Sequence, residues 1–348
     1  MSLAHTVRMR RRPSFPLLLG ACLVLAACQP PPPPPQPAMT SADNGGAISA
    51  PAPDTQPLPE DVLEGTNWPP ARLASGTASV SCSTDYVEDG DGQALVDLGY
   101  LSVLDALAPC RETGVVRLRY EGKISSDFAD LVERTTAMAE RMEIERRVLD
   151  IDSAGGMVED GIRAGDVIAD SHWTIWVREG DICHSACVFV LSAGDNRLVS
   201  GPVGIHRIIR LHSDATTRAE LDAELRGVHD NIKAYFSRNG VDVAVADMMM
   251  TVPSRALRLL TTEELRRYGI SGRNPAQEDL ERIQLARLCG VDFVHRKEAF
   301  VRAFEKQCAE EGEDVEVMGE CGLALRDEYG FPDPACPAES PLSEYDVL

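Results

Sequence analysis

The sequence predicts an α/β fold, because strand-like and helix-like segments alternate along its middle part. Apolar and polar residues alternate over residues 115–124, which is the period of a strand. Residues 128–142 carry apolar positions at helical spacing. Short apolar runs at residues 147–151 and 173–177 flank a second helical stretch that begins at Val158. Strands in such an order pair in parallel, with helices on the faces of the sheet.

The segments that follow continue this alternation and then become helical. Residues 183–191 predict a buried helix, and residues 198–209 predict extended structure. Residues 278–308 predict two helices that are separated near Gly290, because glycine is favoured where helices end.

The charge and the motif content of the chain limit its partners. Its 34 basic and 55 acidic residues give a net charge of −21. Binding to a phosphate backbone needs a basic face, so we expect no nucleic-acid partner. The sequence has no phosphate-binding-loop lysine, no dinucleotide-binding glycine motif and no zinc-ligand spacing. We therefore expect no cofactor and no metal.

The first residues have the order of an export signal. Four arginines between Arg8 and Arg12 precede an apolar run at residues 17–27, which is too short to span a bilayer. The run ends in L-A-A-C at Cys28, which resembles a bacterial lipobox, where the cysteine is lipidated and becomes the first mature residue. We predict a signal peptide at residues 1–27 and a lipid anchor, palmitate included, at Cys28. The alternatives are a plain secretory signal and a cysteine inside an ordinary apolar segment.

The net charge of the mature chain and the residue after Cys28 together predict where the protein is located. Cleavage before Cys28 removes four arginines and no acids, so the net charge becomes 30 − 55 = −25. Anionic headgroups repel such a chain, so lipid and not charge would hold it to the bilayer. The next residue is Gln29 and not aspartate, which resembles the sorting signal for the outer membrane. We predict a place in the bacterial cell envelope, anchored in the outer membrane and facing the periplasm.

Proline dominates the segment after the anchor. Thirteen of the 23 prolines lie between Pro30 and Pro70. Such a segment builds no core and favours extended polyproline II structure. We predict a disordered tether over residues 28–75, with a proline-rich ligand for a partner domain as the alternative. The rest of the chain divides into an α/β domain at residues 76–275 and a helical, acidic C-terminal extension at residues 276–348.

Eight cysteines remain after export, and an even number in an oxidising compartment predicts disulfides. Pairing of sequence neighbours is the simplest of the many connectivities. It predicts the bonds Cys82–Cys110, Cys183–Cys187, Cys289–Cys308 and Cys321–Cys336. The pair at residues 183 and 187 has two alternatives: two small buried residues, or a reactive thiol that stands in for the serine between them.

Three short motifs carry candidate chemistry. The S-A-G-G segment at residues 153–156 follows a predicted strand, and its glycines allow close approach of the backbone. In the C-H-S-A-C segment at residues 183–187, Ser185 lies where a helix is expected to begin. His206 follows an extended apolar stretch. Each motif also has a structural explanation: a glycine turn, an N-cap serine and a histidine at a strand end without a role.

In this order the motifs resemble the Clp protease proteolytic-subunit and crotonase superfamily, and more narrowly its periplasmic, ClpP-like lipoprotein branch. The L-T-T-E-E-L-R-R-Y-G-I segment at residues 260–270 is similar to the one that ends the family's core. The resemblance covers about residues 115–273. It implies a β-α-β superhelical core, a peptide or protein substrate, and a homo-oligomer as one form of the protein. ATP-driven unfoldase partners are disfavoured, because the predicted location lies outside the cytoplasm.

The resemblance also assigns roles by position. Ser185 corresponds to the nucleophile and His206 to the general base. Gly155, Gly156 and Ala186 correspond to the oxyanion hole, in which the last two donate their amide hydrogens. A serine hydroxyl needs a base to take its proton, and histidine, with an unperturbed pKa of about 6.5, suits this task at neutral pH.

One residue of the family pattern is missing. The aspartate that orients the histidine would fall at Leu257, and no acid lies between Asp247 and Glu263. Asp214 or Asp247 could supply the carboxylate from elsewhere, or a serine–histidine pair could work alone. A serine–lysine pair, as in signal peptide peptidase relatives, would need Lys233.

Two hypotheses follow for the function. The first is a serine hydrolase, best assigned as a peptidase, that uses Ser185 and His206. The second is a degenerate binding or scaffold lipoprotein that keeps the fold without activity. Acyl-CoA chemistry of the crotonase type is disfavoured, because CoA is cytoplasmic.

Overall fold

The computed structural model describes residues 47–49, 60–210, 213–253, 256–308, 315–343 and 345. The predicted signal peptide, Cys28 and the run of six prolines lie outside these residues. Across the described part of the chain, no helix combines the length and the apolar character that a membrane crossing needs.

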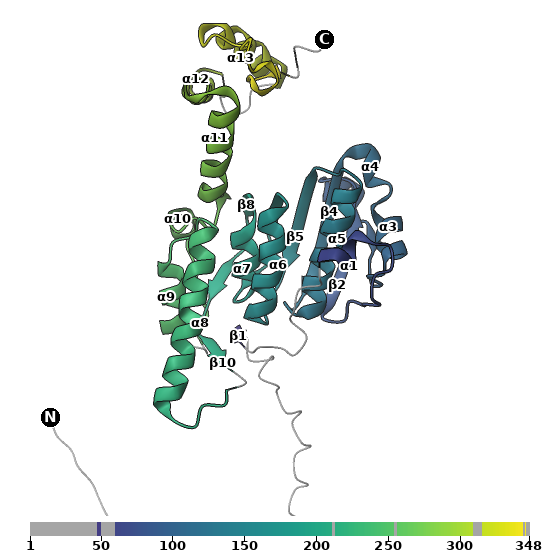
Figure 1. Ribbon diagram of the computed structural model, residues 1–348, viewed down its shortest axis with the longest axis vertical. Helices are drawn as coiled ribbons and strands as arrows, with labels where there is room; N and C mark the ends of the chain where they lie inside the picture. Colours follow the sequence, from purple (N-terminus) through teal and green to yellow (C-terminus); the bar gives the residue numbers. More distant parts are fainter. Residues whose placement is uncertain are drawn as a thin grey trace, which may run out of the picture. The chain divides into compact units, whose positions relative to one another are not determined.

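A seven-stranded mixed sheet forms the centre of the α/β domain (Figure 1). Its strands follow the order β12-β8-β6-β5-β4-β2-β3. The parallel middle strands are β4 (Val115–Gly122), β5 (Arg146–Asp152), β6 (Trp173–Val177) and β8 (Asn196–Val199). The outer strands are antiparallel to their neighbours: β12 (Gly272–Arg273) is one edge of the sheet, β3 (Gln93–Ala94) is the other, and β2 (Gly76–Ser81) lies between β3 and β4. The α/β class and the parallel core are confirmed, and the antiparallel edges are an addition.

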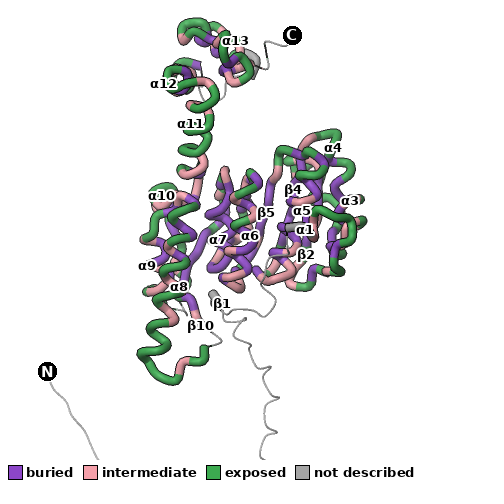
Figure 2. Tube along the Cα trace, viewed as in Figure 1, coloured by how far each residue is buried: buried purple, intermediate pink, exposed green. Residues whose placement is uncertain are grey.

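Three helices lie against this sheet: α5 (Ser126–Arg141), α6 (Val158–Asp170) and α7 (Cys187–Ala193). The alternation in β4 explains the packing, because Val116, Leu118 and Tyr120 are fully buried on one face. The Tyr120 ring lies 4.5 Å from the ring of Phe128 in α5, measured between centroids. Every residue of α7 is buried, and Figure 2 shows this helix in the burial colour throughout. The predicted strands and the helix near residues 128–142 are thus confirmed.

Arginines occupy the other face of β4 and are buried as well. Arg117 and Arg119 bond the carboxylate of Asp150 in β5, with N–O distances of 3.2 Å and 2.8 Å. Arg178, just after β6, pairs with the same carboxylate. A fully buried carboxylate is tolerated only with such partners. The middle strands are therefore enclosed on both faces, by apolar side chains on one and by ion pairs on the other.

A second, three-stranded sheet positions the candidate site. Its order is β11-β9-β7, with β7 (Cys183–His184) parallel and β11 (Arg258–Leu259) antiparallel to β9 (Val203–Ile205). An isolated bridge joins Ser153, next to the carboxyl end of β5, to Cys183. The end of β5, the turn after β7 and the strand β9 are therefore held together by main-chain pairing.

The remaining elements surround these sheets. The strand β1 (Ala47–Ser49) pairs in parallel with β10 (Ile208–Arg210). The other helices of this part are α1 (Glu60–Glu64), α2 (Tyr86–Asp89), α3 (Tyr100–Leu107), α4 (Cys110–Thr113), α8 (Arg218–Arg238), α9 (Ala244–Thr251) and α10 (Thr262–Arg267). A capping box between Thr261 and Glu264 begins α10, inside the segment at residues 260–270.

Packed structure includes residues 60–75, which the composition placed in the tether. Trp68 and Leu73 are only 6% exposed. The guanidinium of Arg134 in α5 donates to the carbonyl of Pro69 at 2.8 Å. The domain starts earlier than proline content suggests, because the apolar side chains among these prolines are buried against it.

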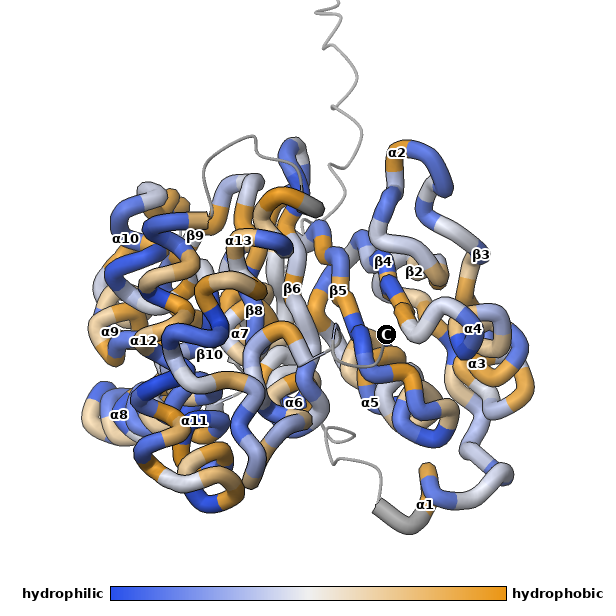
Figure 3. Tube along the Cα trace, turned by 90° about the horizontal axis from the view of Figure 1, so that it is seen from above, coloured by the Kyte–Doolittle hydropathy of each residue, from blue (hydrophilic) through white to orange (hydrophobic). Residues whose placement is uncertain are grey.

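The C-terminal extension has a hydrophobic cluster of its own. It contains α11 (Pro275–Cys289), α12 (Val291–Gln307), α13 (Val315–Glu328) and a short 3₁₀ helix (Pro337–Glu339). Phe293, Phe300 and Phe331 are buried at its centre. Gly290 separates α11 from α12, as predicted. By contrast α11 has no buried residue, and Figure 3 shows hydrophilic and hydrophobic residues mixed along it.

Four disulfides join the eight predicted cysteines. Cys82–Cys110 and Cys183–Cys187 are confirmed, with Cα–Cα distances of 4.7 Å and 5.2 Å. In the extension the neighbour pairing is wrong, because the bonds are Cys289–Cys336 and Cys308–Cys321. The 17 residues of α12 separate residues 289 and 308. At about 1.5 Å per residue that helix spans about 25 Å, far beyond the reach of a disulfide.

Candidate active site

Ser185 lies in the turn between β7 and α7. Its φ of 60° falls in the left-handed region, which few residues other than glycine adopt. Its side chain is fully buried, and the hydroxyl oxygen has no hydrogen-bond partner among the described residues. A buried hydroxyl without a partner and a strained backbone both cost free energy, and such features concentrate at functional sites.

The predicted helix at residues 183–191 begins later than expected. Cys183 and His184 form the strand β7, because they pair with β9, and α7 starts only at Cys187. Ala186 occupies the N-cap position of α7 and no side chain caps this helix. The N-cap explanation for Ser185 is therefore wrong.

The disulfide between Cys183 and Cys187 closes the turn that carries Ser185. One sulfur belongs to Cys183, the first residue of β7, and the other to Cys187, the first residue of α7. Both sulfurs are used in the bond, so neither is a thiol that could replace the serine. The bond holds the two ends of the turn together and thereby restrains Ser185.

Gly155 approaches Ser185 more closely than any other residue type could. Its φ is 100°. A Cβ atom at this position would lie 2.5 Å from Ser185 Cβ and 2.9 Å from Ser185 Oγ. Gly156 is similarly confined, since its Cβ would lie 2.1 Å from the carbonyl oxygen of Ile124. The two glycines are thus required by close contacts, and the first of these contacts is with the candidate nucleophile.

The N–H groups of the candidate oxyanion hole differ in whether they already donate a hydrogen bond. The N–H of Gly155 donates to Ser153 Oγ at 3.1 Å. The N–H groups of Gly156 and Ala186 donate no hydrogen bond to any residue in the described part of the chain. These two amides are the ones that the sequence predicted as donors, and the structure leaves them available.

Ser153 connects the glycine segment to the serine turn. Its own N–H donates to Ile182 O at 2.8 Å, and its carbonyl accepts from the N–H of His184 at 2.9 Å. With the Oγ bond to Gly155, three hydrogen bonds converge on one residue. Sequence reasoning gave Ser153 no role of its own, although its place before the glycines was visible.

His206 follows β9 and is 2% exposed. Its Nδ1–H donates to the backbone carbonyl of Arg207, with an N–O distance of 3.1 Å. This bond makes Nε2 the nitrogen without a proton. Burial lowers the pKa of His206, and the hydrogen bond to Arg207 partly opposes that shift. The ring is therefore neutral at neutral pH, as a general base must be.

The pairing of β7 with β9 brings the two candidates to the same end of the small sheet. The N–H of Ser185 donates to the carbonyl of Gly204 at 2.8 Å, and His206 is two residues further along the chain. The hydroxyl of Ser185 and the ring of His206 are not hydrogen-bonded to each other. Catalytic hydrogen bonds are often longer before substrate binds.

The candidate carboxylates do not orient His206. Asp247 pairs with His229 and Lys233 of α8, at 2.8 Å in both cases. Lys233 is therefore engaged in an ion pair. Asp214 is exposed. The Arg207 carbonyl takes the position on Nδ1 that an aspartate has in a triad.

An apolar residue and a second histidine lie beside Gly204. A Cβ at Gly204 would meet Leu257 Cδ1 at 2.7 Å and His184 Cδ2 at 2.9 Å. Leu257 is the position where the family aspartate was expected. Burial lowers the pKa of His184, and the electrostatic interaction with the neighbouring His206 ring, which would oppose a second positive charge, lowers it further. Sequence reasoning missed His184, which the register β7–β9 places opposite Gly204.

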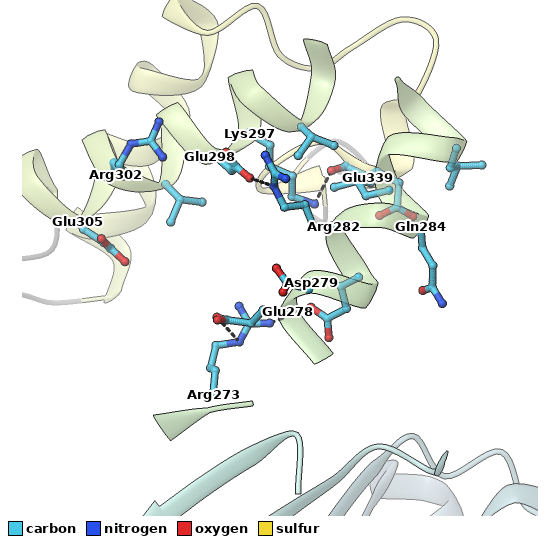
Figure 4. Close-up of a pocket in the computed structure, with 15 residues that line it drawn as sticks. Arg273, Glu278, Asp279, Arg282, Gln284, Lys297, Glu298, Arg302, Glu305 and Glu339 are labelled. Atoms are coloured by element: carbon cyan, nitrogen blue, oxygen red, sulfur yellow. Dashed lines mark hydrogen bonds and ion pairs between the residues drawn. The ribbon is translucent and has the colours of Figure 1, made fainter. Parts of the chain in front are cut away.

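A cavity of about 880 Å³ lies at α11 and α12 and is drawn in Figure 4. Charged side chains line it and bond one another: Arg282 with Glu298 at 2.5 Å and Arg273 with Glu281 at 2.9 Å. Its described lining contains no serine, cysteine or histidine. We therefore assign this cavity no part in the serine chemistry of the candidate site.

The fold and the site together define an α/β protein with a buried serine turn, a glycine segment against it and a neutral histidine. No family model matches the chain, and no curated protein matches it. Among solved structures, a serine-to-alanine mutant of the 1510-N membrane-bound stomatin-specific protease is 21% identical, with a TM-score of 0.36, over 47% of this chain and 81% of that chain. A lysine-to-alanine mutant in complex with a substrate peptide is 22% identical, with a TM-score of 0.36, over 44% and 71%.

Proposed function

We propose that the protein is a serine hydrolase that cleaves peptides, with Ser185 as nucleophile and His206 as general base. The observation that carries the proposal is the turn at Ser185. A left-handed serine costs about 1–3 kcal/mol and persists only where the surrounding structure imposes it. Here a disulfide, a main-chain bond to Gly204 and the contact with Gly155 all impose it.

The proposed reaction proceeds in two halves. Ser185 Oγ attacks the substrate carbonyl carbon while His206 Nε2 accepts the hydroxyl proton. The amides of Gly156 and Ala186 donate to the oxyanion that forms, a contribution worth about 3–4 kcal/mol for one donor in other enzymes. His206 then gives its proton to the leaving amine. Water attacks the acyl-enzyme with His206 as base again, and the serine hydroxyl is restored.

The orientation of His206 by a carbonyl has a consequence for the rate. The Arg207 carbonyl fixes the tautomer that a general base needs. It carries no full charge, so it stabilises the imidazolium less than an aspartate would. We therefore propose an ATP-independent peptidase that is slower than enzymes with a complete triad.

The proposal includes a location at the outer membrane. A lipid at Cys28, followed by the proline-rich segment, would hold the domain at the periplasmic side of the outer membrane. The oxidising periplasm suits a site that contains the bond Cys183–Cys187.

A scaffold or binding lipoprotein without activity is the second candidate. The observation in its favour is that Asp247 pairs with His229 and Lys233, while a backbone carbonyl and not a carboxylate accepts from Nδ1 of His206. In this case the strained serine turn would be a remnant of an active ancestor.

Labelling with a fluorophosphonate probe separates the two candidates. We expect the parent protein to be labelled on Ser185 and the Ser185→Ala variant to remain unlabelled. Ser192→Ala is the matched control, because Ser192 is also fully buried but donates to the carbonyl of Val188. The control should be labelled like the parent. A parent that stays unlabelled between about pH 6 and pH 9 would favour the scaffold.

The pH dependence of labelling should follow from the burial of His206. Its pKa lies below the ordinary value of about 6.5, so the ring loses its proton at lower pH than usual. We expect the labelling rate to be level through neutral pH and to fall only below about pH 6.5. Rates measured from about pH 5 to pH 8 test this, and a midpoint above about 7 would contradict the role of His206.

A further inference from the structure

A short strand from the segment before the domain lies beside the strand that follows His206. The strand β1 pairs in parallel with β10, with Ala47 opposite Ile208 and Ser49 opposite Arg210. The two strands form a sheet of their own in the described chain. One edge of β10 is therefore paired with a piece of the proline-rich segment and not with the domain.

The place of this strand is close to both halves of the candidate site. β10 begins two residues after His206. β1 also contacts α6, the helix that starts directly after the Gly155-Gly156 segment. Figure 1 shows β1 next to β10 and near the lower end of α6. β1 thus lies between the element that follows the base and the element that follows the oxyanion glycines.

Unpaired strand edges recognise extended peptides. Such an edge presents N–H and C=O groups in a row, and a peptide in extended conformation satisfies them by adding a strand. The main-chain bonds give affinity, and alternate side chains give specificity. Without β1, the edge of β10 would be such a row, and it begins two residues after the proposed base.

We infer that β10 is the acceptor strand for the peptide substrate, and that Ala47–Ser49 occupies it as an intramolecular pseudosubstrate. The inference rests on the proposed peptidase function. The ligand class is an uncharged, extended peptide with small and aliphatic residues, like the A-I-S sequence of β1. It enters parallel to β10, because β1 does.

The tethered strand competes with any free peptide. A segment joined by a short linker has an effective concentration in the millimolar range. If β1 itself binds the edge of β10 with an intrinsic Kd near 0.1 mM, an effective concentration of about 1 mM lowers the apparent affinity of a free peptide by about tenfold. Access to the site depends on the release of β1.

The substitution Ile48→Pro tests the pairing. Proline lacks the N–H of a strand residue and does not fit the interior of a ladder. The matched control is Ser41→Pro, which adds a proline to the same segment outside β1. All proteins carry Ser185→Ala in the full chain, so that no peptide is cleaved.

The probe is a fluorescent synthetic peptide with the sequence of residues 44–52, N-G-G-A-I-S-A-P-A, which has no charged side chain. We expect it to bind the Ile48→Pro protein about tenfold more tightly than the Ser185→Ala parent or the Ser41→Pro control, as measured by fluorescence anisotropy. Hydrogen exchange of the amides in Ile208–Arg210 supplies a second readout. Protection there should fall in Ile48→Pro and return when the peptide is added.

Equal affinity and equal protection in the three proteins would overturn the inference. Lost protection in Ile48→Pro without peptide binding would overturn it as well, because β10 would then accept no free peptide. The binding measurement needs no catalysis. If the peptide binds as expected but the parent protein is not labelled by fluorophosphonate, the acceptor strand stands and the proposed hydrolase fails.

Discussion

Replacement of Gly155 by alanine should abolish labelling of Ser185 and destabilise the protein. The new Cβ would lie 2.5 Å from Ser185 Cβ and 2.7 Å from the carbonyl oxygen of His184. The backbone φ of 100° is also unfavourable for alanine. Strain and overpacking of this kind each cost about 1–3 kcal/mol, so we expect the free energy of unfolding to fall by about 3 kcal/mol or more. Thermal unfolding and probe labelling measure the two effects.

Gly180→Ala is the matched control for this prediction. Gly180 has a similar φ of 92°, but a Cβ there would meet nothing within 4 Å. This variant carries the backbone strain without the collision, so it should lose about 1 kcal/mol of stability and keep its labelling. If both variants lose labelling alike, the contact between Gly155 and Ser185 is not what matters.

Replacement of His206 by glutamine should slow the labelling of Ser185 by about 10²–10⁴-fold, the usual contribution of a general base. Glutamine keeps a polar side chain of similar size but cannot accept the serine proton at neutral pH. The fold should be retained, which thermal unfolding can verify. Labelling reactions that are stopped at successive times give the rates for the parent and the variant, and thus their ratio.

Variants of two further histidines test whether the loss of labelling is specific to His206. His172→Gln should label like the parent, because His172 is 64% exposed at its side chain and bonds Asp195. His184→Gln tests the imidazole that lies beside Gly204. A large loss in His184→Gln together with a small loss in His206→Gln would transfer the role of base to His184.

The central strands could be predicted because their signal is local. Val116, Leu118 and Tyr120 alternate along β4, and that alternation predicts a strand whatever its neighbours are. The edges β3 and β12 contain two residues each and have no periodicity. They exist because longer strands beside them offer free hydrogen-bonding groups, which is information that the short segments do not contain.

The predicted bond between Cys289 and Cys308 conflicts with the helices predicted from the same sequence. The two helices between residues 278 and 308 were predicted, and a long helix between Cys289 and Cys308 already excludes a bond between its ends. Helix length should therefore have ruled out that pair. The correct partners, Cys336 and Cys321, depend on how the later chain folds back.

The candidate site was predicted in its residue types but not in its geometry. A buried left-handed serine has no signature in sequence, because its φ follows from the closure of the turn by the bond between Cys183 and Cys187 and from the pairing of β7 with β9. The partner of His206 Nδ1 was also beyond sequence reasoning. It is a backbone carbonyl, which every residue has, whereas the family pattern has an aspartate at this place.

The arrangement of the disulfides gives the chain a simple covalent topology. Among the described residues, two bonds close loops before residue 188 and two close nested loops after residue 288. None of these four crosslinks the α/β domain to the extension. The two parts can therefore be oxidised in either order during folding, without waiting for each other. A single backbone cut within α11, which has no buried residue, would separate them into fragments that each retain their own pair of bonds.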